Sequence, residues 1–206
     1  MAAATASESR KVAALVGLSL LEVIRARDLP TEILGSENPS ETMPRRLGLT
    51  EAVEQQIRRF RGEVKRRGRI ADHEVAALFA LVLRRPDARE VFFQAGELLA
   101  GKDAPVRGVA RWLPGPLRYA LARRHFRRRF RALFGRPVGG FAHGPFALEA
   151  GGHFLLELEP GGKGCALLSG FAQTILSRYL RRPVSVKHAS CVGVGQEICR
   201  WVVSDS

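Results

Sequence analysis

Apolar side chains recur every three or four residues through the first half of the chain, which is the spacing of an amphipathic helix. This pattern predicts helices over 11–26, about 50–66, 72–85, 87–101 and from Pro116 onward. Asp72 and Asp87 are placed to cap the third and fourth of these helices,. We therefore expect the first half of the chain to be entirely helical.

The pattern changes after Gly135, where pairs of glycines separate short apolar runs. The runs 146–150 and 153–159 are typical of antiparallel strands. Alternation in the second run places Phe154, Leu156 and Leu158 on the packed face of a sheet,. Both runs are therefore predicted to be strands.

A helix and a hairpin are predicted to close the chain. Residues 165–180 indicate the helix, and the runs 184–191 and 197–203, joined by a glycine-containing link, indicate the hairpin,. The order of elements is thus helices followed by β-β-α-β-β. It predicts an α+β fold in which N-terminal helices pack on a four-stranded antiparallel sheet.

The length of 206 residues suits one well-buried domain,. Residues 35–44 are rich in turn-forming residues and predict a loop,. We expect residues 1–45 to form an N-terminal extension and residues 46–206 to form the domain. The apolar stretch 12–24 is too short to span a bilayer and is not followed by a small-residue cleavage site, so a buried amphipathic helix is a better interpretation than a signal peptide,. Three cysteines, an odd number, fit a reducing compartment, and we expect a cytoplasmic protein,.

A net charge of +13 favours an anionic partner,. Residues 104–148 contain no acidic residue and ten arginines. On the helix after Pro116, a basic face lies opposite the apolar stripe and consists of Arg124, Arg127, Arg128 and Arg131,. This helix is interpreted as a core helix with a basic outer face, as a surface for an anionic membrane or an acidic partner, or as a nucleic-acid helix. Nucleic acid is the least favoured partner, because the aromatic residues lie on the apolar stripe rather than among the arginines.

All three cysteines lie in the closing part of the chain, at Cys165, Cys191 and Cys199. A hairpin beside a helix can bring their sulfur atoms together, and zinc accepts such a set with one histidine nitrogen. Strand alternation places His188 and Cys191 on opposite faces unless a bulge intervenes, which weakens His188 as the fourth ligand. The alternatives are that the thiols only pack the interface between helix and sheet, or that they are reactive. Cys165 would be the reactive one, because a helix N-terminus lowers the pKa of a thiol.

Nothing in the sequence indicates a hydrolase. Residues 161–164 (Gly-Gly-Lys-Gly) lack the spacing of a phosphate-binding loop and are interpreted as a flexible turn before a helix,. The remaining histidines are scattered, and no serine lies in a nucleophile elbow,.

The order of these parts resembles the 4-vinyl reductase or hydrocarbon-binding domain family over roughly residues 90–203. That fold is shared with the small subunits of the TRAPP vesicle-tethering complex and is related to that of haem-based nitric-oxide sensors. The residues that carry the resemblance are Phe92-Phe-Gln-Ala-Gly96, Phe134-Gly135, Cys165, Ser169-Gly170-Phe171, Val184-Ser-Val-Lys-His188-Ala-Ser-Cys191, Gly195 and Cys199-Arg-Trp-Val-Val203. The chain departs from the family at His188, where members usually have an acidic residue.

The resemblance implies a non-catalytic carrier or sensor for a hydrophobic small molecule such as an acyl chain, a hydrocarbon or a tetrapyrrole precursor. We expect its apolar pocket to be lined from among ten residues, of which about half only pack the core: Phe92, Phe93, Leu117, Phe126, Phe130, Phe154, Leu156, Leu168, Phe171 and Trp201,. Some family members are thought to bind metal through the equivalent cysteines, and zinc is the candidate cofactor.

Two other functions remain open. One is a dimeric peripheral scaffold that uses the arginine-rich face on anionic lipid or an acidic partner. The other is a component of vinyl reduction in bacteriochlorophyll synthesis. The chain has no Gly-x-Gly-x-x-Gly nucleotide motif, which disfavours a reductase,.

Overall fold

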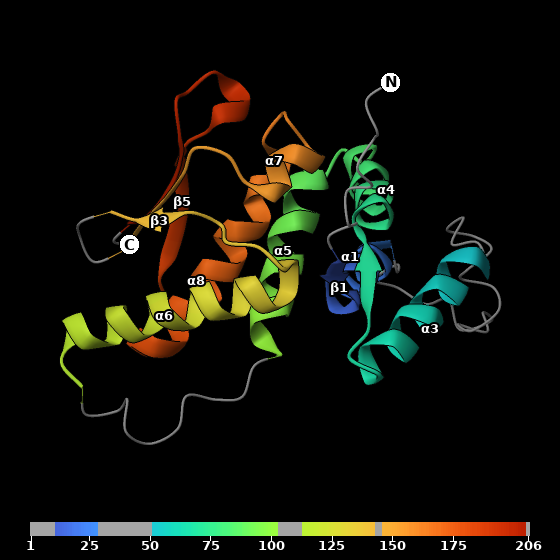
Figure 1. Ribbon diagram of the computed structural model, residues 1–206, viewed down its shortest axis with the longest axis horizontal. Coiled ribbons are helices and arrows are strands. Elements are labelled where there is room, and N and C mark those ends of the chain that lie inside the picture. Colours follow the sequence, from blue (N-terminus) through green and yellow to red (C-terminus); the bar gives the residue numbers. More distant parts are fainter. Residues whose placement is uncertain (1–10, 29–50, 103–112, 143–145, 205–206) are drawn as a thin grey trace, which may run out of the picture.

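Figure 1 shows a computed structural model of the chain, in which residues 11–28, 51–102, 113–142 and 146–204 are described. In order, the elements are β1 (Lys11–Ala13), α1 (Ala14–Asp28), α3 (Glu51–Lys65), β2 (Arg69–Ala71), α4 (Asp72–Leu83), α5 (Ala88–Gly101), α6 (Gly115–Phe134), β3 (Gly140–Phe141), β4 (Ala147–Ala150), α7 (Phe154–Leu158), the 3-10 turn η2 (Lys163–Cys165), α8 (Ala166–Leu180), β5 (Ser185–Ser190), the 3-10 turn η3 (Val192–Val194) and β6 (Cys199–Ser204). The predicted α+β fold is confirmed.

The four-stranded sheet has the order β3-β4-β6-β5, and every neighbouring pair is antiparallel. Helix α8 packs against β5, α6 and α5, and α5 in turn packs against α1. Figure 1 shows the same sequence of layers, from the sheet through α8 and α5 to the N-terminal helices. Helix α8 is therefore the central element, and its residues from Ala166 through Ala172 are all buried.

Helices α5 and α8 cross at two glycines, so close that their backbones touch. A Cβ atom added to Gly96 would lie 2.1 Å from the carbonyl oxygen of Leu167, and one added to Gly170 would lie 2.1 Å from that of Phe93. Any larger residue would drive the helices apart. Both glycines belong to the segments that carry the family resemblance, and here close packing accounts for them.

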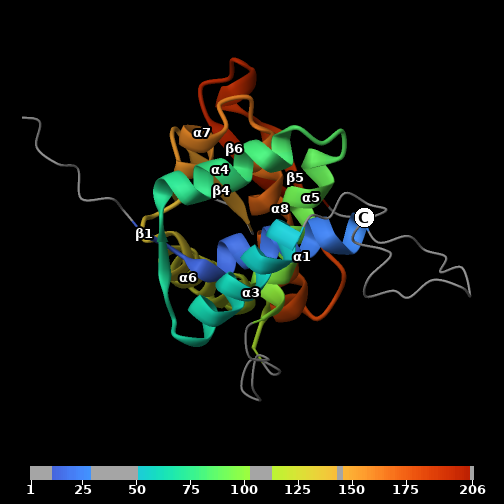
Figure 2. The same ribbon diagram turned by 90° about the vertical axis from the view of Figure 1, so that its right-hand side faces the viewer.

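The N-terminal helix packs into this core. Helix α1 is buried on nearly all sides, as expected for the apolar stretch 12–24, and it lies between α3 and α4 (Figure 2). It is preceded by β1, which pairs with β2 in a two-stranded antiparallel sheet. The sequence pattern missed both short strands. The loop predicted at 35–44, and with it the boundary at residue 45, lies outside the described residues.

The strand predicted over 153–159 is wrong, because this segment forms the short helix α7. Phe154 and Leu155 are adjacent in sequence and both buried, which alternation in a strand does not allow,. An apolar run this short is compatible with a strand or with a helix, so the spacing of its apolar residues does not distinguish the two. The fourth strand is instead β3, so the sheet has four antiparallel strands as predicted, with two helices, α7 and α8, between its first and second pairs.

The expected helix caps at two aspartates also need correction. Asp72 is the first residue of α4, and its carboxylate pairs with Arg136. Asp87 stands at the N-cap position of α5 without a side-chain cap bond. Its carboxylate accepts hydrogen bonds from Arg85 and Arg27 instead. In both cases a guanidinium competes for the carboxylate that the helix end would otherwise use.

Candidate metal centre and adjoining cavities

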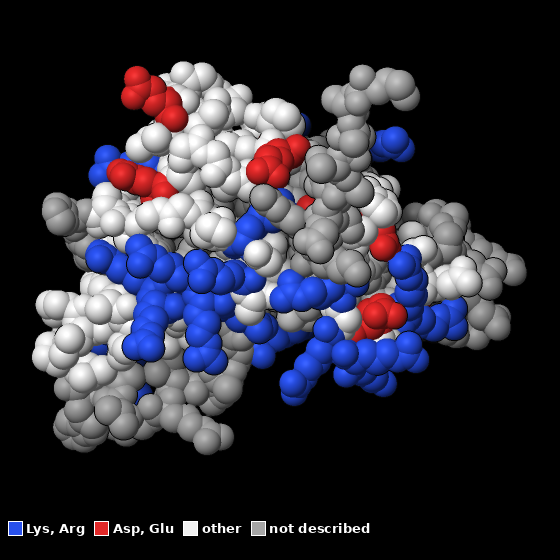
Figure 3. Space-filling model, in the orientation of Figure 1, with Lys and Arg blue, Asp and Glu red and all other residues white. Residues whose placement is uncertain are grey.

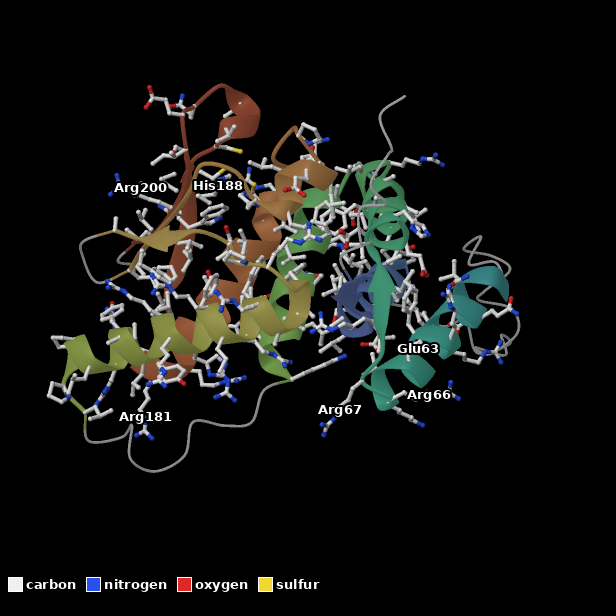
Figure 4. The ribbon with its side chains drawn as sticks, viewed as in Figure 1. Glu63, Arg66, Arg67, Arg181, His188 and Arg200 are labelled. Atoms are coloured by element: carbon white, nitrogen blue, oxygen red, sulfur yellow. The ribbon has the colours of Figure 1, made fainter. Side chains whose placement is uncertain are left out.

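Three cysteines and one histidine meet where the start of α8 packs against the closing hairpin. One ligand atom from each of Cys165, His188, Cys191 and Cys199 lies within 4.8 Å of every other. The three cysteines are free and buried. Figure 4 shows the labelled His188 beside sulfur atoms at this end of the sheet. The group can hold a metal ion such as zinc.

A β-bulge brings His188 into this group. His188 pairs with Trp201 and Ser190 pairs with Arg200, so Ala189 is the extra residue. One inserted residue reverses the alternation, and His188 and Cys191 come to the same face of the sheet although they are three positions apart. The expectation that His188 points away from the cysteines is therefore wrong.

The glycine-containing turn before η2 packs directly against the cluster. Gly162 has a φ of 82°, and a Cβ atom there would lie 2.5 Å from the Sγ atom of Cys191. Gly193 in η3 approaches the same turn, where a Cβ atom would lie 2.2 Å from the carbonyl oxygen of Pro160. The side chain of Glu159 accepts a hydrogen bond from the backbone N–H of Gly164 at 3.0 Å. The segment 161–164 is thus a turn, as predicted. Because Gly162 has no side chain, the hairpin can pack directly against this turn.

Burial disfavours the ionised form of two thiols of the cluster, Cys165 and Cys199. It raises the pKa of the Cys165 thiol well above its usual range, and the neighbouring Cys199 and Cys191 raise it further. Burial also raises the pKa of Cys199, against a hydrogen bond from the N–H of Val192. The lowered pKa expected for Cys165 at a helix N-terminus is therefore wrong, because desolvation outweighs the helix dipole.

The imidazole groups are held neutral. Burial lowers the pKa of His188 to about 4, with a further contribution from the charge of Arg89. Neutral imidazole is the form that binds metal. The Nε2 atom of His188 is buried and has no hydrogen-bond partner among the described residues, so the side chain has an unused donor or acceptor inside the protein,.

His153 is a candidate functional residue that the sequence pattern missed. Its Nε2 atom lies 3.7 Å from the Sγ atom of Cys165, and its Nδ1 atom is buried without a partner among the described residues. Burial, followed by the charge of His188, lowers its pKa to about 4. The strand prediction placed His153 on a solvated face, and only the preceding glycine pair could have signalled a break there.

Trp201 holds the two histidines in place. Its indole stacks on His188 with ring centroids 4.6 Å apart and an interplanar angle of 13°, and it meets His153 edge-on at 5.5 Å. Its Nε1–H donates a hydrogen bond of 3.3 Å to the carbonyl oxygen of Cys165. One fully buried side chain therefore contacts both the hairpin ligand and the helix ligand of the cluster.

The donor set and its spacing fit tetrahedral zinc. Four ligands about 2.3 Å from a central ion would lie about 3.8 Å from one another. The Sγ atoms of Cys191 and Cys199 are 3.8 Å apart. The longest separation in the group, within 4.8 Å, needs only small side-chain rotations to contract to that value,.

Two cavities adjoin the cluster. One has a volume of about 440 Å³ and is lined by Arg89, Glu90, Phe93, Gln94, Ala166, Ser169, Val186, Lys187 and His188. The other, of about 260 Å³, shares Arg89, Ala166 and His188 with the first and extends along 161–163 to Cys191. His188 therefore belongs both to the cluster and to the walls of these cavities.

The ten residues expected to line an apolar pocket are distributed unevenly. Phe93 lines the 440 Å³ cavity, and Leu117 is 50% exposed. Leu156 is partly buried against the core. The remaining seven are buried core residues: Phe92, Phe126, Phe130, Phe154, Leu168, Phe171 and Trp201. Among these, Phe126 contacts Phe130 and Phe171 through their rings.

The arginines expected to form one basic face lie in different surroundings. Figure 3 shows a band of Lys and Arg along α6 that continues toward α3. Of the four predicted arginines, Arg127 lies over the ring of Phe141, 4.8 Å from its centroid. Arg124 and Arg128 line a separate cavity beside α8, and Arg131 is exposed. These four arginines of α6 therefore differ in what they contact, and they do not form one uniform basic face.

None of the described helices is long and apolar enough to cross a membrane. No protein-family model, curated protein or solved structure matches the chain.

Proposed function

We propose that the protein is a zinc-containing binding module that takes up a small hydrophobic molecule with a polar end beside its metal centre. The observation that carries the proposal is the group of four ligating atoms that lie within 4.8 Å of one another. The same His188 lines the adjoining 440 Å³ cavity. The resemblance to the hydrocarbon-binding domain family supports the same function, because it implies a hydrophobic ligand and some members are thought to bind metal through the equivalent cysteines.

Zinc in this group would be structural. Cys165, Cys191, Cys199 and His188 supply four protein ligands, which fill a tetrahedral site and leave no position for a reacting water. Bound there, the ion would neutralise the thiolates and cross-link the start of α8 to both strands of the hairpin. His153 would donate its Nε2–H to the Cys165 thiolate and so orient that ligand.

The cavity favours an amphipathic ligand. Its volume of about 440 Å³ lies within the usual range of small-molecule pockets,. Phe93, Ala166 and Val186 provide apolar walls. Arg89 and Lys187 provide two cations against the one carboxylate of Glu90, an excess that suits an anionic end. An acyl chain with a carboxylate has both features. The arrangement of the cavity supports carriage or sensing rather than catalysis.

Metal content tests the first half of this proposal. Zinc is measured by inorganic mass spectrometry and native mass spectrometry on the full chain and on Cys191→Ser and His188→Gln. The expected result is one zinc per chain in the wild type and a loss in both variants, with no change in the control His73→Gln, whose side chain is exposed on α4. A wild-type chain that stays metal-free after exposure to zinc under reducing conditions overturns the proposed metal site.

Ligand binding tests the second half. The fluorescent fatty acid cis-parinaric acid is titrated into the zinc-loaded protein, and the expected result is saturable binding. Gln94→Trp fills the cavity and should abolish that binding, whereas Gln55→Trp places the same residue on an exposed position of α3 and should not. Equal binding by all three proteins overturns the assignment of the cavity.

A further inference from the structure

A third cavity lies at the other end of α8, between that helix and α6. It has a volume of about 430 Å³ and is lined by Leu121, Arg124, His125, Arg128, Arg129, Ala132 and Tyr179. Cys165 precedes α8 and Tyr179 lies in its last turn, so the helix separates this cavity from the metal centre by about 20 Å,. The proposed metal and acyl sites do not involve any of its residues.

The charge of this cavity is one-sided. Arg124, Arg128 and Arg129 contribute three guanidinium groups, and none of the described residues that line the cavity is acidic. Among the described residues, neither Arg124 nor Arg128 has a carboxylate partner. These two arginines are four positions apart on one helix face, where like charges destabilise the helix. A bound anion would remove that repulsion.

Other arginines in and after α6 already contact aromatic rings or carboxylates of the protein. Arg123 and Arg127 lie over the ring of Phe141, at 5.6 and 4.8 Å from its centroid. Arg136 is buried against Asp72 and Glu157 and lies 4.0 Å above the ring of Phe154. The pair Arg124 and Arg128 therefore differs from its neighbours in facing a cavity rather than a ring or a carboxylate.

Polar side chains from both helices complete the lining of the cavity. The Nδ1 atom of His125 and the hydroxyl oxygen of Tyr179 are 3.1 Å apart and share a hydrogen bond that joins α6 to α8. Their rings meet edge-on, with centroids 5.6 Å apart. This contact ties the two helices together and places the Tyr179 hydroxyl group, from α8, in the same lining as the arginines of α6. Leu121 adds a partly exposed apolar surface.

We propose that this cavity binds an organic phosphate, with Arg124 and Arg128 as the groups that hold the phosphate oxygens. Guanidinium groups match phosphate geometry through paired N–H donors. The volume of about 430 Å³ exceeds what a bare phosphate ion needs and leaves room for an organic substituent against Leu121. A concave site with several cationic donors in one lining favours a single phosphate group over the extended backbone of a nucleic acid, which tracks a groove,.

The test uses phenyl phosphate as the probe, measured by isothermal titration calorimetry on the full chain. Arg124→Gln and Arg128→Gln are each expected to weaken its binding about tenfold, the effect of losing one charge-assisted contact. Arg131→Gln is the matched control, because it removes the same charge from an exposed position of α6 outside the cavity. No variant should melt at a lower temperature than the wild type, since these side chains are exposed and removing one charge only relieves repulsion along α6,.

A second experiment distinguishes a lipid headgroup from a soluble organic phosphate as the source of the phosphate group. Co-sedimentation with phosphatidylcholine vesicles that contain phosphatidic acid is compared with vesicles that lack it. Vesicle binding that Arg124→Gln and Arg128→Gln weaken more than Arg131→Gln does assigns the site to a lipid headgroup, whereas binding of phenyl phosphate alone assigns it to a soluble phosphate. Equal weakening by all three variants, or no binding of either probe, overturns the proposal. Zinc-free protein should give the same results, so failure here is distinct from failure of the metal site.

Discussion

The close crossing of α5 and α8 predicts that a glycine-to-alanine change inside a helix lowers the free energy of unfolding, whereas such a change usually raises it. Alanine is favoured over glycine in a helix by about 1 kcal/mol, so Gly170→Ala would be stabilising if only local propensity mattered. The added Cβ atom would lie 2.1 Å from the carbonyl oxygen of Phe93, while ordinary contact begins near 3.4 Å. The helices must therefore separate by about 1.3 Å, the difference between these two distances.

That separation is costly because the interface is fully packed. A gap of about 1 Å removes up to half of the dispersion energy of each contact across it, and overpacked cores lose typically 1–3 kcal/mol or more. The added atom meets backbone that cannot rotate away, so we take the upper end of this range, about 3 kcal/mol,. Subtracting the propensity gain of about 1 kcal/mol, we expect Gly170→Ala to lower the free energy of unfolding by about 2 kcal/mol. Gly96→Ala, where the added atom meets the carbonyl oxygen of Leu167 at the same distance, should behave alike.

Urea denaturation followed by circular dichroism measures this change, and Gly62→Ala is the matched control. Gly62 lies in α3, and a Cβ atom there would meet nothing within 4 Å. The control should therefore be stabilised by about 0.5–1 kcal/mol. If Gly170→Ala were as stable as the wild type, the helices would not be in backbone contact and the central packing described above would be wrong.

Three further predictions concern the hairpin, the metal and an ion-pair network. Deleting Ala189 removes the bulge and turns His188 away from the cysteines, so zinc affinity in a chelator competition should fall at least tenfold although every ligand residue remains,. Stripping zinc with a chelator should lower the melting temperature, since a ligand at a hundred times its Kd stabilises the folded state by about 2.7 kcal/mol, and an unchanged melting curve would contradict a structural ion. Hydrogen bonding to Arg85 and Arg27 lowers the pKa of Asp87, so its stabilising contribution is complete above the unfolded pKa of about 3.9 and is lost as the pH falls toward the folded value,. Asp87→Asn should cost about 1 kcal/mol at pH 7 and progressively less in acid, as measured by urea unfolding across that range.

The sequence predicts the helical half well because long segments show their period. In α3 and α6 the stripes that contain Ile57 and Phe126 are buried at their centres and partly buried at one or both ends, and four or more turns of consistent spacing leave little ambiguity,. The prediction fails at 153–159, where five residues of helix are too few to show a period. It also misses β1, β2 and β3, each of which has at most three residues and depends on a partner distant in sequence,.

The candidate metal site shows the same division between local and non-local information. That three cysteines would gather was foreseeable from a helix packed against a hairpin. The fourth ligand was not, because the bulge at Ala189 depends on how β5 and β6 pair rather than on any residue type that marks a bulge,. His153 was missed for a related reason, since its place beside Cys165 depends on α7 turning the chain back toward α8.

The two proposed sites lie at opposite ends of one rigid helix, and this arrangement argues against strong coupling between them. For metal loss at Cys165 to alter phosphate binding near Tyr179, α8 would have to shift or rotate as a body. The contacts of Gly96 and Gly170 oppose such a movement, because the backbones of α5 and α8 already touch and α8 is buried along its first half. Local changes at the hairpin can be absorbed by η3, which has no buried residue. Loss of the metal should therefore loosen the hairpin and its cavity while it leaves the arginine site on α6 intact, which makes the two proposals independent in their energetics as well as in their tests.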